Sequence, residues 1–499
     1  MGNVDSSQLA PIPLGFEYMC LVLHKPDGIR IIHGSEQNIA IIKEVLLSTW
    51  EAGLDDKDAK MKCHGYVQSF KLTGFPFDKG SSQVEAVNAR KLVSKLLWKL
   101  NNVGWKLVMT TDLSRKLGLG TFFFVKEETE AVTYTFPCIN LSSSDKIQFV
   151  NFSQRLYPQF LSVIESTWTQ GIQMIESEEE NLYEVKMHGD PWKGFGQESI
   201  ESRSMIQKLI ELCAKNQLSF HCAANIKNTA DSLFFYHEPK LTEGVIPSMF
   251  SISLNGTDGV RLINYPANMQ SVVQQVLVDN WAWRGGVASE REFYGGYEYK
   301  LNGNPWWSEE KESIMARYLI LKLLEALQGY GWHVIGGFDV SRRLTTKSTL
   351  IFQQSAPMKT PLLCISASGS DKLRFINTPD AELSIMREIM HKHWPKKISA
   401  EKRKDTALGV SCVQFKMNGT PWHGEDDDKY YARSMMCFLL QALSKRSWKP
   451  VLSADVSAQY DKDDDDEKYP KDVHSWWFMK VESPDELWGG STQYGFLMH

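Results

Sequence analysis

The stretch Tyr299-Lys300-Leu301-Asn302-Gly303-Asn304-Pro305-Trp306 occurs in four versions along the chain. The other three are Phe70-Lys71-Leu72-Thr73-Gly74-Phe75-Pro76-Phe77, Val185-Lys186-Met187-His188-Gly189-Asp190-Pro191-Trp192 and Phe415-Lys416-Met417-Asn418-Gly419-Thr420-Pro421-Trp422. Their prolines lie 115, 114 and 116 residues apart. Such regular spacing predicts one structural unit that is copied four times.

Each version of this motif predicts a strand that ends in a turn before a helix. The lysine alternates with apolar residues, as on a strand with one face towards a core. Glycine suits the strand end because it adopts a positive φ without strain. Proline suits the turn because its φ is fixed and it has no N–H to donate to a ladder. The motif lysines are expected on the solvent face, at Lys71, Lys186, Lys300 and Lys416.

The elements around the motif recur in the same order. Two short strands precede a first helix, and a variable charged loop separates this helix from the motif. The second strand ends in a polar residue expected to cap the helix, namely His33, Asn151, Asn264 or Asn377. A long helix and two strands follow the motif. Each unit reads β-β-α-β-α-β-β, an α+β fold with a mostly antiparallel sheet and two helices on one of its faces.

These elements divide the 499 residues into tandem units of about 115 residues. The predicted segments are a flexible N-terminal segment at 1–15, repeat units at 16–128, 132–238, 248–354 and 361–482, and a C-terminal tail at 483–499. Units 1 and 3 share an Asp-(Leu/Val)-Ser-Arg ending, at Asp112 and Asp339. This likeness favours an arrangement of the units in pairs over a row or a closed ring.

The composition is that of a globular protein, with 42% hydrophobic and 23% charged residues. The net charge of −5 argues against a nucleic-acid binder that depends on neutralising phosphates. The eight cysteines form no Cys-x-x-Cys and do not recur at matching positions, so we expect reduced, buried thiols in a cytoplasmic protein. No apolar run reaches the roughly 18 residues of a membrane helix.

The first residues, Met1-Gly2-Asn3-Val4-Asp5-Ser6, match the pattern for N-myristoylation of Gly2. The alternative is an unmodified, frayed terminus. One myristoyl chain binds membranes only weakly and reversibly. Acylation of Gly2 would therefore predict a peripheral membrane protein.

An arginine in each long helix is followed 22 residues later by an acidic or amide residue. We interpret these as structural pairs that tie the helix to a strand end, namely Arg90 with Asp112, Arg317 with Asp339, and Arg433 with Asp455. Unit 2 carries Arg203 with Asn225 instead. The alternative interpretation is contact with an anion or another ligand, through Arg203, Asn225, Ser114, Arg115, Ser341 and Arg342.

No phosphate-binding loop, zinc-protease motif or nucleophile elbow occurs in the sequence. We therefore assign no catalytic residue, no cofactor and no metal ligand. The leading hypothesis is a non-enzymatic scaffold whose variable loops bind protein partners. The alternative is an enzyme, or a protein that binds a small ligand or a lipid, with its pocket between units. A concave pocket lined by Arg203, Asn225 or the Asp-Ser-Arg turns would favour the alternative; flat surfaces would favour the scaffold.

Overall fold

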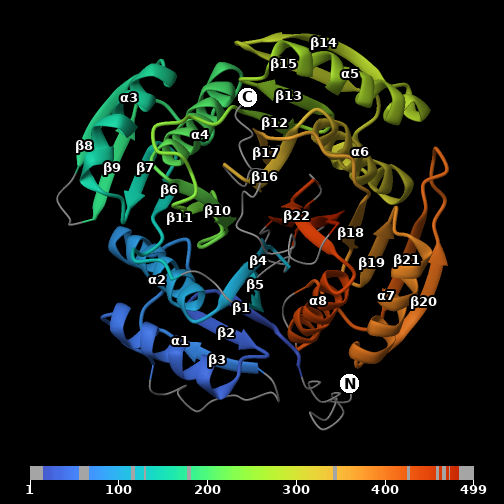
Figure 1. Cartoon of the computed structure of the whole chain (residues 1–499), viewed down its shortest axis with the longest axis horizontal. Coiled ribbons are helices and arrows are strands. Elements are labelled where there is room, and N and C mark those ends of the chain that lie inside the picture. Colours follow the sequence, from blue (N-terminus) through green and yellow to red (C-terminus); the bar gives the residue numbers. More distant parts are fainter. Residues whose placement is uncertain are drawn as a thin grey trace.

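Four similar units stand side by side in a closed ring, with unit 4 next to unit 1 (Figure 1). The computed structural model describes residues 15–55, 67–113, 118–127, 131–176, 181–340, 346–423, 427–456, 460–462, 468–470 and 473–482. Gly2, Ser114, Arg115, Ser341 and Arg342 lie outside these ranges. The prediction that the units form pairs, which rested on the shared Asp-Ser-Arg endings, is therefore wrong.

Units 1 and 2 follow the expected order of elements. Unit 1 contains β1 (Tyr18–His24), β2 (Gly28–Ile32), α1 (Glu36–Thr49), β3 (Val67–Lys71), α2 (Gln83–Asn102), β4 (Trp105–Thr111) and β5 (Gly118–Lys126). Unit 2 contains β6 (Cys138–Ser142), β7 (Lys146–Val150), η2 (Gln154–Leu156), α3 (Tyr157–Thr167), β8 (Ile172–Glu176), β9 (Leu182–Met187), α4 (Gln197–Lys215), β10 (Leu218–Ala224) and β11 (Ser232–His237).

Units 3 and 4 repeat this order. Unit 3 contains β12 (Met249–Asn255), β13 (Gly259–Ile263), α5 (Ala267–Trp281), η3 (Ala282–Arg284), β14 (Val287–Phe293), β15 (Gly296–Leu301), η4 (Pro305–Trp307), α6 (Glu310–Gly329), β16 (Trp332–Phe338) and β17 (Thr346–Gln354). Unit 4 contains β18 (Leu362–Ser368), β19 (Lys372–Ile376), α7 (Asp380–His393), β20 (Ile398–Arg403), β21 (Cys412–Met417), α8 (Asp428–Ser444), β22 (Trp448–Ala454), β23 (Tyr460–Lys462), β24 (Lys468–Pro470) and β25 (Ser475–Lys480).

Each unit forms one antiparallel sheet with two helices, as the sequence predicts. The strand orders are β3-β2-β1-β5-β4, β10-β11-β6-β7-β9-β8, β14-β15-β13-β12-β17-β16 and β20-β21-β19-β18-β25-β22. Strands β8, β14 and β20 lie where a variable loop was expected, and each pairs with its motif strand as the outer edge of the sheet. The opposite edge strands, β4, β10, β16 and β22, meet at the centre of the ring (Figure 1).

The motif forms the turn that its residues predict. Its glycines adopt positive φ angles of 91°, 74°, 77° and 92° at Gly74, Gly189, Gly303 and Gly419. The tryptophan that ends each first helix donates its indole N–H to the carbonyl just before that glycine; Trp281 Nε1, for example, lies 2.8 Å from Asn302 O. The motif lysine pairs with the aspartate of the first hairpin turn, as Lys300 Nζ does with Asp258 Oδ1 at 2.8 Å. These contacts fix the motif turn against the first helix.

The polar residue after each second strand does not cap the helix that follows. His33, Asn151, Asn264 and Asn377 adopt positive φ angles of 63°, 61°, 51° and 54°, and the helices begin three to six residues later. Asparagine tolerates this left-handed conformation better than most residues do. The prediction of a cap at these positions is wrong because the chain turns sharply there instead.

Both faces of each sheet are covered. The two helices of a unit pack on one face, and the long helix of the preceding unit packs on the other: α2 on β7, α4 on β12, α6 on β18 and α8 on β1. Each of the four large hydrophobic clusters therefore joins residues of two neighbouring units. The expectation that the two helices of a unit pack on one face of its sheet is confirmed. The second helical layer comes from the preceding unit, and strands such as β12 are therefore buried along their whole length.

Candidate functional site

The repeated arginine of each long helix lies at the seam between two units. Arg317 donates from Nε to Ser366 Oγ and Ser475 Oγ of unit 4, at 2.9 and 3.1 Å, and from Nη1 to the carbonyl of Ser313 at 3.0 Å. The equivalent bonds join Arg90 to Ser232, Arg203 to Thr349 and Arg433 to Thr121. All four arginines are at least 98% buried. Their role is to join neighbouring units.

The aspartate or asparagine that follows each inner strand also joins two units. Its backbone carbonyl accepts a hydrogen bond from the preceding unit in all four cases: Asp112 from His474, Asn225 from Gly120, Asp339 from Asp231, and Asp455 from Ser348. The N···O distances are 3.2, 2.7, 2.8 and 3.2 Å. These four equivalent bonds close the ring around its axis.

The charges of a repeated arginine and a repeated aspartate act on each other across two of the seams. Burial lowers the pKa of Arg433, and the charge of Asp112 in unit 1 is among the groups that act in the opposite direction. Burial also lowers the pKa of Arg203 to about 10, and Asp339 in unit 3 opposes that shift. The sequence paired each arginine with the aspartate of its own unit. These two electrostatic interactions involve the aspartate of the following unit.

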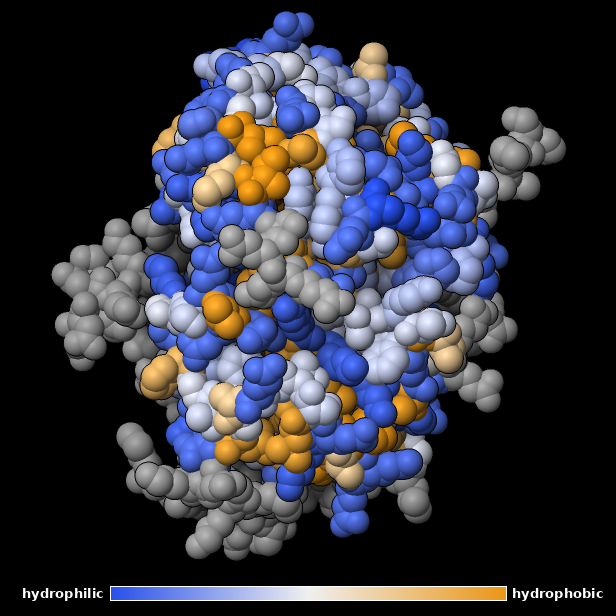
Figure 2. All heavy atoms as spheres, turned by 90° about the vertical axis from the view of Figure 1, so that its left-hand side faces the viewer, coloured by the Kyte–Doolittle hydropathy of each residue, from blue (hydrophilic) through white to orange (hydrophobic). Residues whose placement is uncertain are grey.

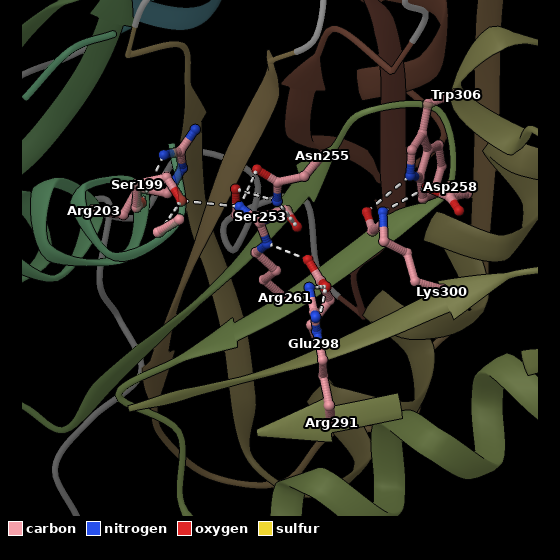
Figure 3. Close-up of polar contacts among 12 residues, drawn as sticks. Ser199, Arg203, Ser253, Asn255, Asp258, Arg261, Arg291, Glu298, Lys300 and Trp306 are labelled. Atoms are coloured by element: carbon pink, nitrogen blue, oxygen red, sulfur yellow. Dashed lines mark hydrogen bonds and ion pairs between the residues drawn. The ribbon is translucent and has the colours of Figure 1, made fainter. Parts of the chain in front are cut away.

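Polar groups continue this seam between units 2 and 3 (Figure 3). Arg261 donates from Nη1 to Ser199 Oγ at 3.0 Å and from Nε to Glu298 Oε2 at 2.6 Å. Arg291 donates to the other oxygen of Glu298, and Arg203 donates to the carbonyl of Ser199 at 2.7 Å. Because the Glu298 carboxylate accepts from two arginines and Ser199 accepts from two more donors, this network stabilises the seam.

A pocket of about 780 Å³ lies where the four inner strands converge. Every unit contributes to its lining through β4, β10, β16 and β22, and the connection after β5 and the end of β11 add to it. A volume of this size lies within the range that holds small organic molecules. The pocket therefore belongs to the assembled ring and not to any single unit.

Each inner strand carries a β-bulge at the same position. The bulged residues are Val108, His221, Ile335 and Val451, each of which is skipped in the pairing with the neighbouring strand. All four line the pocket. Bulges bend a strand and redirect a side chain, so the repeated bulge supplies each unit with one pocket position. Three units place an aliphatic residue there, and unit 2 places a histidine.

Two glycines let β16 approach its neighbours closely at the pocket. A Cβ atom on Gly336 would lie 2.5 Å from Cε1 of Phe220 in β10. A Cβ atom on Gly337 would lie 3.1 Å from Cδ1 of Leu452 in β22. Neither glycine has a positive φ, so the requirement for glycine comes from close packing between units.

Lys106 and His221 are two of the several polar and charged residues in the pocket lining. Burial, together with the nearby charge of Lys106, lowers the pKa of His221 to about 3. Burial also lowers the pKa of Lys106, while the carboxylates of Glu127 and Glu238 act in the opposite direction. His221 is therefore a neutral imidazole at neutral pH. Its ring lies edge-on to Phe136 and Tyr236, with centroids 5.0 and 5.4 Å away.

Of the residues predicted as ligand contacts, the structure brings one to the pocket. Asn225 lies in its lining, where its Nδ2 donates to Asp112 Oδ2 at 3.1 Å. Arg203 lies in the seam between units 2 and 3, away from the pocket lining. The other four, Ser114, Arg115, Ser341 and Arg342, lie outside the described residues.

Lys106 and His221 were not identified from the sequence. The residues predicted as ligand contacts or structural pairs recur between units at equal spacing, whereas the positions of Lys106 and His221 vary from unit to unit. Alignment of the inner strands on their common start shows the signal, since His221 holds the position of Val108, Ile335 and Val451. A polar residue at a position that is aliphatic in the other units indicates that this position is not needed for the common fold.

The outer surface on the side of units 1 and 2 is mixed in character. Where described residues are in view, Figure 2 shows hydrophobic side chains in separate groups among hydrophilic ones. Phe195 and Tyr134 are 72% and 70% exposed, but Phe195 follows the motif of unit 2 and Tyr134 lies between β5 and β6. The described residues on this side thus form no single broad apolar surface.

One protein-family model matches the chain four times, over residues 17–133, 135–236, 248–353 and 361–479. The chain belongs to this family. It carries four tandem copies of the family's domain, and each copy corresponds to one unit of the ring. No curated protein and no solved structure matches the chain.

The described residues carry two further negative findings. Among them, no helix is both long enough and apolar enough to cross a membrane. In the same part of the chain, no three or more His, Cys, Asp or Glu side chains lie together as a metal site would require.

Proposed function

We propose that the protein binds a small organic ligand in the pocket on the ring axis. The observation that carries this proposal is a pocket of about 780 Å³ to which all four units contribute. A scaffold made of repeats needs no such cavity, and pockets of this size at the meeting point of structural units are common ligand sites.

The lining favours a ligand with both apolar and polar parts. Val108, Ile335 and Val451 offer aliphatic surface, whereas Lys106 and His221 offer a cation and a neutral imidazole. Binding requires all four units in place, because each contributes part of the wall. The repeated arginines and the four backbone bonds at the seams support the proposal, since they hold the pocket walls at fixed positions.

The test is equilibrium binding of N-phenyl-1-naphthylamine, a neutral probe that fluoresces in apolar sites. We expect saturable binding to the full chain, and at least a tenfold weaker affinity for Ala223→Phe. Ala223 lines the pocket on β10, so the added ring would occupy its volume. Ser271→Phe is the matched control because Ser271 is exposed on the outer face of α5.

The two outcomes separate the hypotheses. Binding that is lost in Ala223→Phe and kept in Ser271→Phe would support the axial pocket. Absent or equal binding in all three proteins would refute it and leave the interaction scaffold as the better hypothesis. Native mass spectrometry of the full chain purified from eukaryotic cells is an independent test, in which a copurifying ligand of a few hundred daltons would support the proposal.

Acylation of Gly2 and attachment to a membrane are separate proposals. They rest on the first six residues alone. The intact mass of the protein from eukaryotic cells, compared with Gly2→Ala, tests them. A gain of one myristoyl mass that the variant lacks would support peripheral membrane attachment, and an unmodified terminus would contradict it.

A further inference from the structure

We propose that the ligand carries an anionic oxygen group, a carboxylate, sulfonate or phosphate, which Lys106 and His221 bind between β4 and β10. This inference rests on the function proposed above and adds the chemical class of the ligand. It concerns one side of the pocket, where units 1 and 2 meet.

Lys106 is a partly buried cation in the pocket wall. Among the described residues it has neither a hydrogen-bond partner nor an ion-pair partner. The motif lysines differ in this respect, because each pairs with the aspartate of its own hairpin turn: Asp27, Asp145, Asp258 and Asp371. A cation that is withdrawn from water and left unpaired costs free energy. A bound anion would remove that cost.

His221 adds a directed donor beside this cation. Because the imidazole is neutral, one ring nitrogen donates and the other accepts. Neither nitrogen has a hydrogen-bond partner within the described ranges, although Phe136 and Tyr236 hold the ring edge-on. An N–H that is fixed in this way donates to an anionic oxygen without first being reordered.

Two carboxylates near Lys106 do not fill the site. Glu238 accepts from the hydroxyl of Tyr236 at 2.9 Å and from the backbone N–H of Lys240 at 3.2 Å. Glu127 and Glu238 both favour the charged form of Lys106. They therefore help to keep the lysine cationic at neutral pH, while no described carboxylate lies within ion-pair distance of its ammonium.

The wall beside this cation is aromatic. Phe136 and Tyr236 line the pocket and contact the ring of His221. A flat apolar body with an acidic substituent fits both features. The favoured ligand class is thus an aromatic acid or a similar flat amphiphilic anion.

The experiment compares two probes that share one ring system. 1-Anilinonaphthalene-8-sulfonate carries a sulfonate, and N-phenyl-1-naphthylamine lacks it. We expect Lys106→Met to weaken sulfonate binding at least tenfold and to change binding of the neutral probe less than twofold. Lys106→Arg should restore most of the affinity for the sulfonate. If Lys106→Met is poorly folded, as judged by its melting curve, Lys106→Gln replaces it.

Lys186 provides the matched control, because it is also a partly buried strand lysine but pairs with Asp145 and lies outside the pocket lining. Lys186→Met should change sulfonate binding less than threefold. Equal losses for both probes in Lys106→Met, no loss, or a larger loss in Lys186→Met would overturn this inference while the pocket itself remained. Failure of the neutral probe to bind the wild-type pocket would instead overturn the proposed function, and this inference with it.

Discussion

Strands β10 and β16 hold the same place in neighbouring units, yet they give the pocket different walls. Both form the inner edge of their sheet and both carry the bulge. At the bulge, β10 presents Phe220 and His221, whereas β16 presents Val334 and Ile335. The next two residues are Cys222 and Ala223 in β10 but Gly336 and Gly337 in β16. Strand β10 thus contributes a polar side chain to the pocket, whereas β16 contributes glycines that allow close packing between units.

This difference teaches which positions the repeat keeps constant. The motif glycine, the first-helix tryptophan and the long-helix arginine recur in all four units, and they hold the turn, the core and the seam. The residues of the inner strands vary from unit to unit. Substitution of a recurring residue should therefore reduce the stability of the ring, and substitution of a varying one should chiefly change binding.

The largest expected effect is loss of a seam arginine. Arg317→Ala removes the hydrogen bonds from its guanidinium to Ser366, Ser475 and the carbonyl of Ser313, and it leaves these three groups buried without this donor. We expect the free energy of unfolding to fall by about 3 kcal/mol. Urea denaturation followed by tryptophan fluorescence measures it. A change below about 0.5 kcal/mol would contradict the role of Arg317 in the seam.

A smaller effect is expected where β16 meets β10. Gly336→Ala places a Cβ atom 2.5 Å from the ring of Phe220, so a strand or the ring must move. We expect a loss of about 1–3 kcal/mol in the free energy of unfolding. Gly337→Ala is the matched control, since its Cβ would lie 3.1 Å from Cδ1 of Leu452, the end of a flexible side chain. Equal melting temperatures for the two variants would argue against close packing at Gly336.

The smallest expected effect, when measured at pH 6, concerns protonation at the seam between units 4 and 1. His33 Nε2 forms a hydrogen bond with Ser434 Oγ, 2.9 Å away. At the same position, two other units have an asparagine that is hydrogen-bonded to a serine of the preceding unit's long helix. Burial, with a small contribution from His393, lowers the pKa of His33 to about 3. The unfolded chain therefore binds more protons than the folded chain does below a pH of about 6.5.

This difference makes the seam less stable as the pH falls below about 6.5, by about 0.8 kcal/mol at pH 6 for one histidine and by more at lower pH. His33→Asn should remove that part of the dependence and leave the stability above pH 7 nearly unchanged. Melting temperatures of both proteins between pH 4 and 8 measure it. Parallel curves over this range would show that His33 does not titrate as described.

The fold of one unit could be predicted from the sequence because its signals are local. Glycine and proline in the motif define a turn, and the spacing of apolar residues around Ile314 and Leu321 defines a helix. The strands β8, β14 and β20 were missed, since their exposed residues, such as those of Val287–Phe293, lack the apolar alternation of a half-buried strand. Pairing with the motif strand alone makes these segments strands.

The ring and its pocket could not be predicted in the same way. In a chain of equal repeats, a partner in the same unit and its equivalent in the next unit show the same regular spacing. The spacing is therefore as consistent with a pair of Arg433 and Asp455 as with the electrostatic interaction of Arg433 with Asp112, in unit 1. Arg433 and Thr121, which form a hydrogen bond, are 312 residues apart. No local sequence pattern predicts that unit 4 packs against unit 1 and closes the ring.

The most direct test of a ligand pocket formed jointly by the four units is a crystal structure of the full chain soaked with N-phenyl-1-naphthylamine. We predict density for the probe among β4, β10, β16 and β22, in contact with His221 and with the aliphatic residues of the other bulges. Density for the probe only on the outer surface, or four units arranged as an open row, would contradict it.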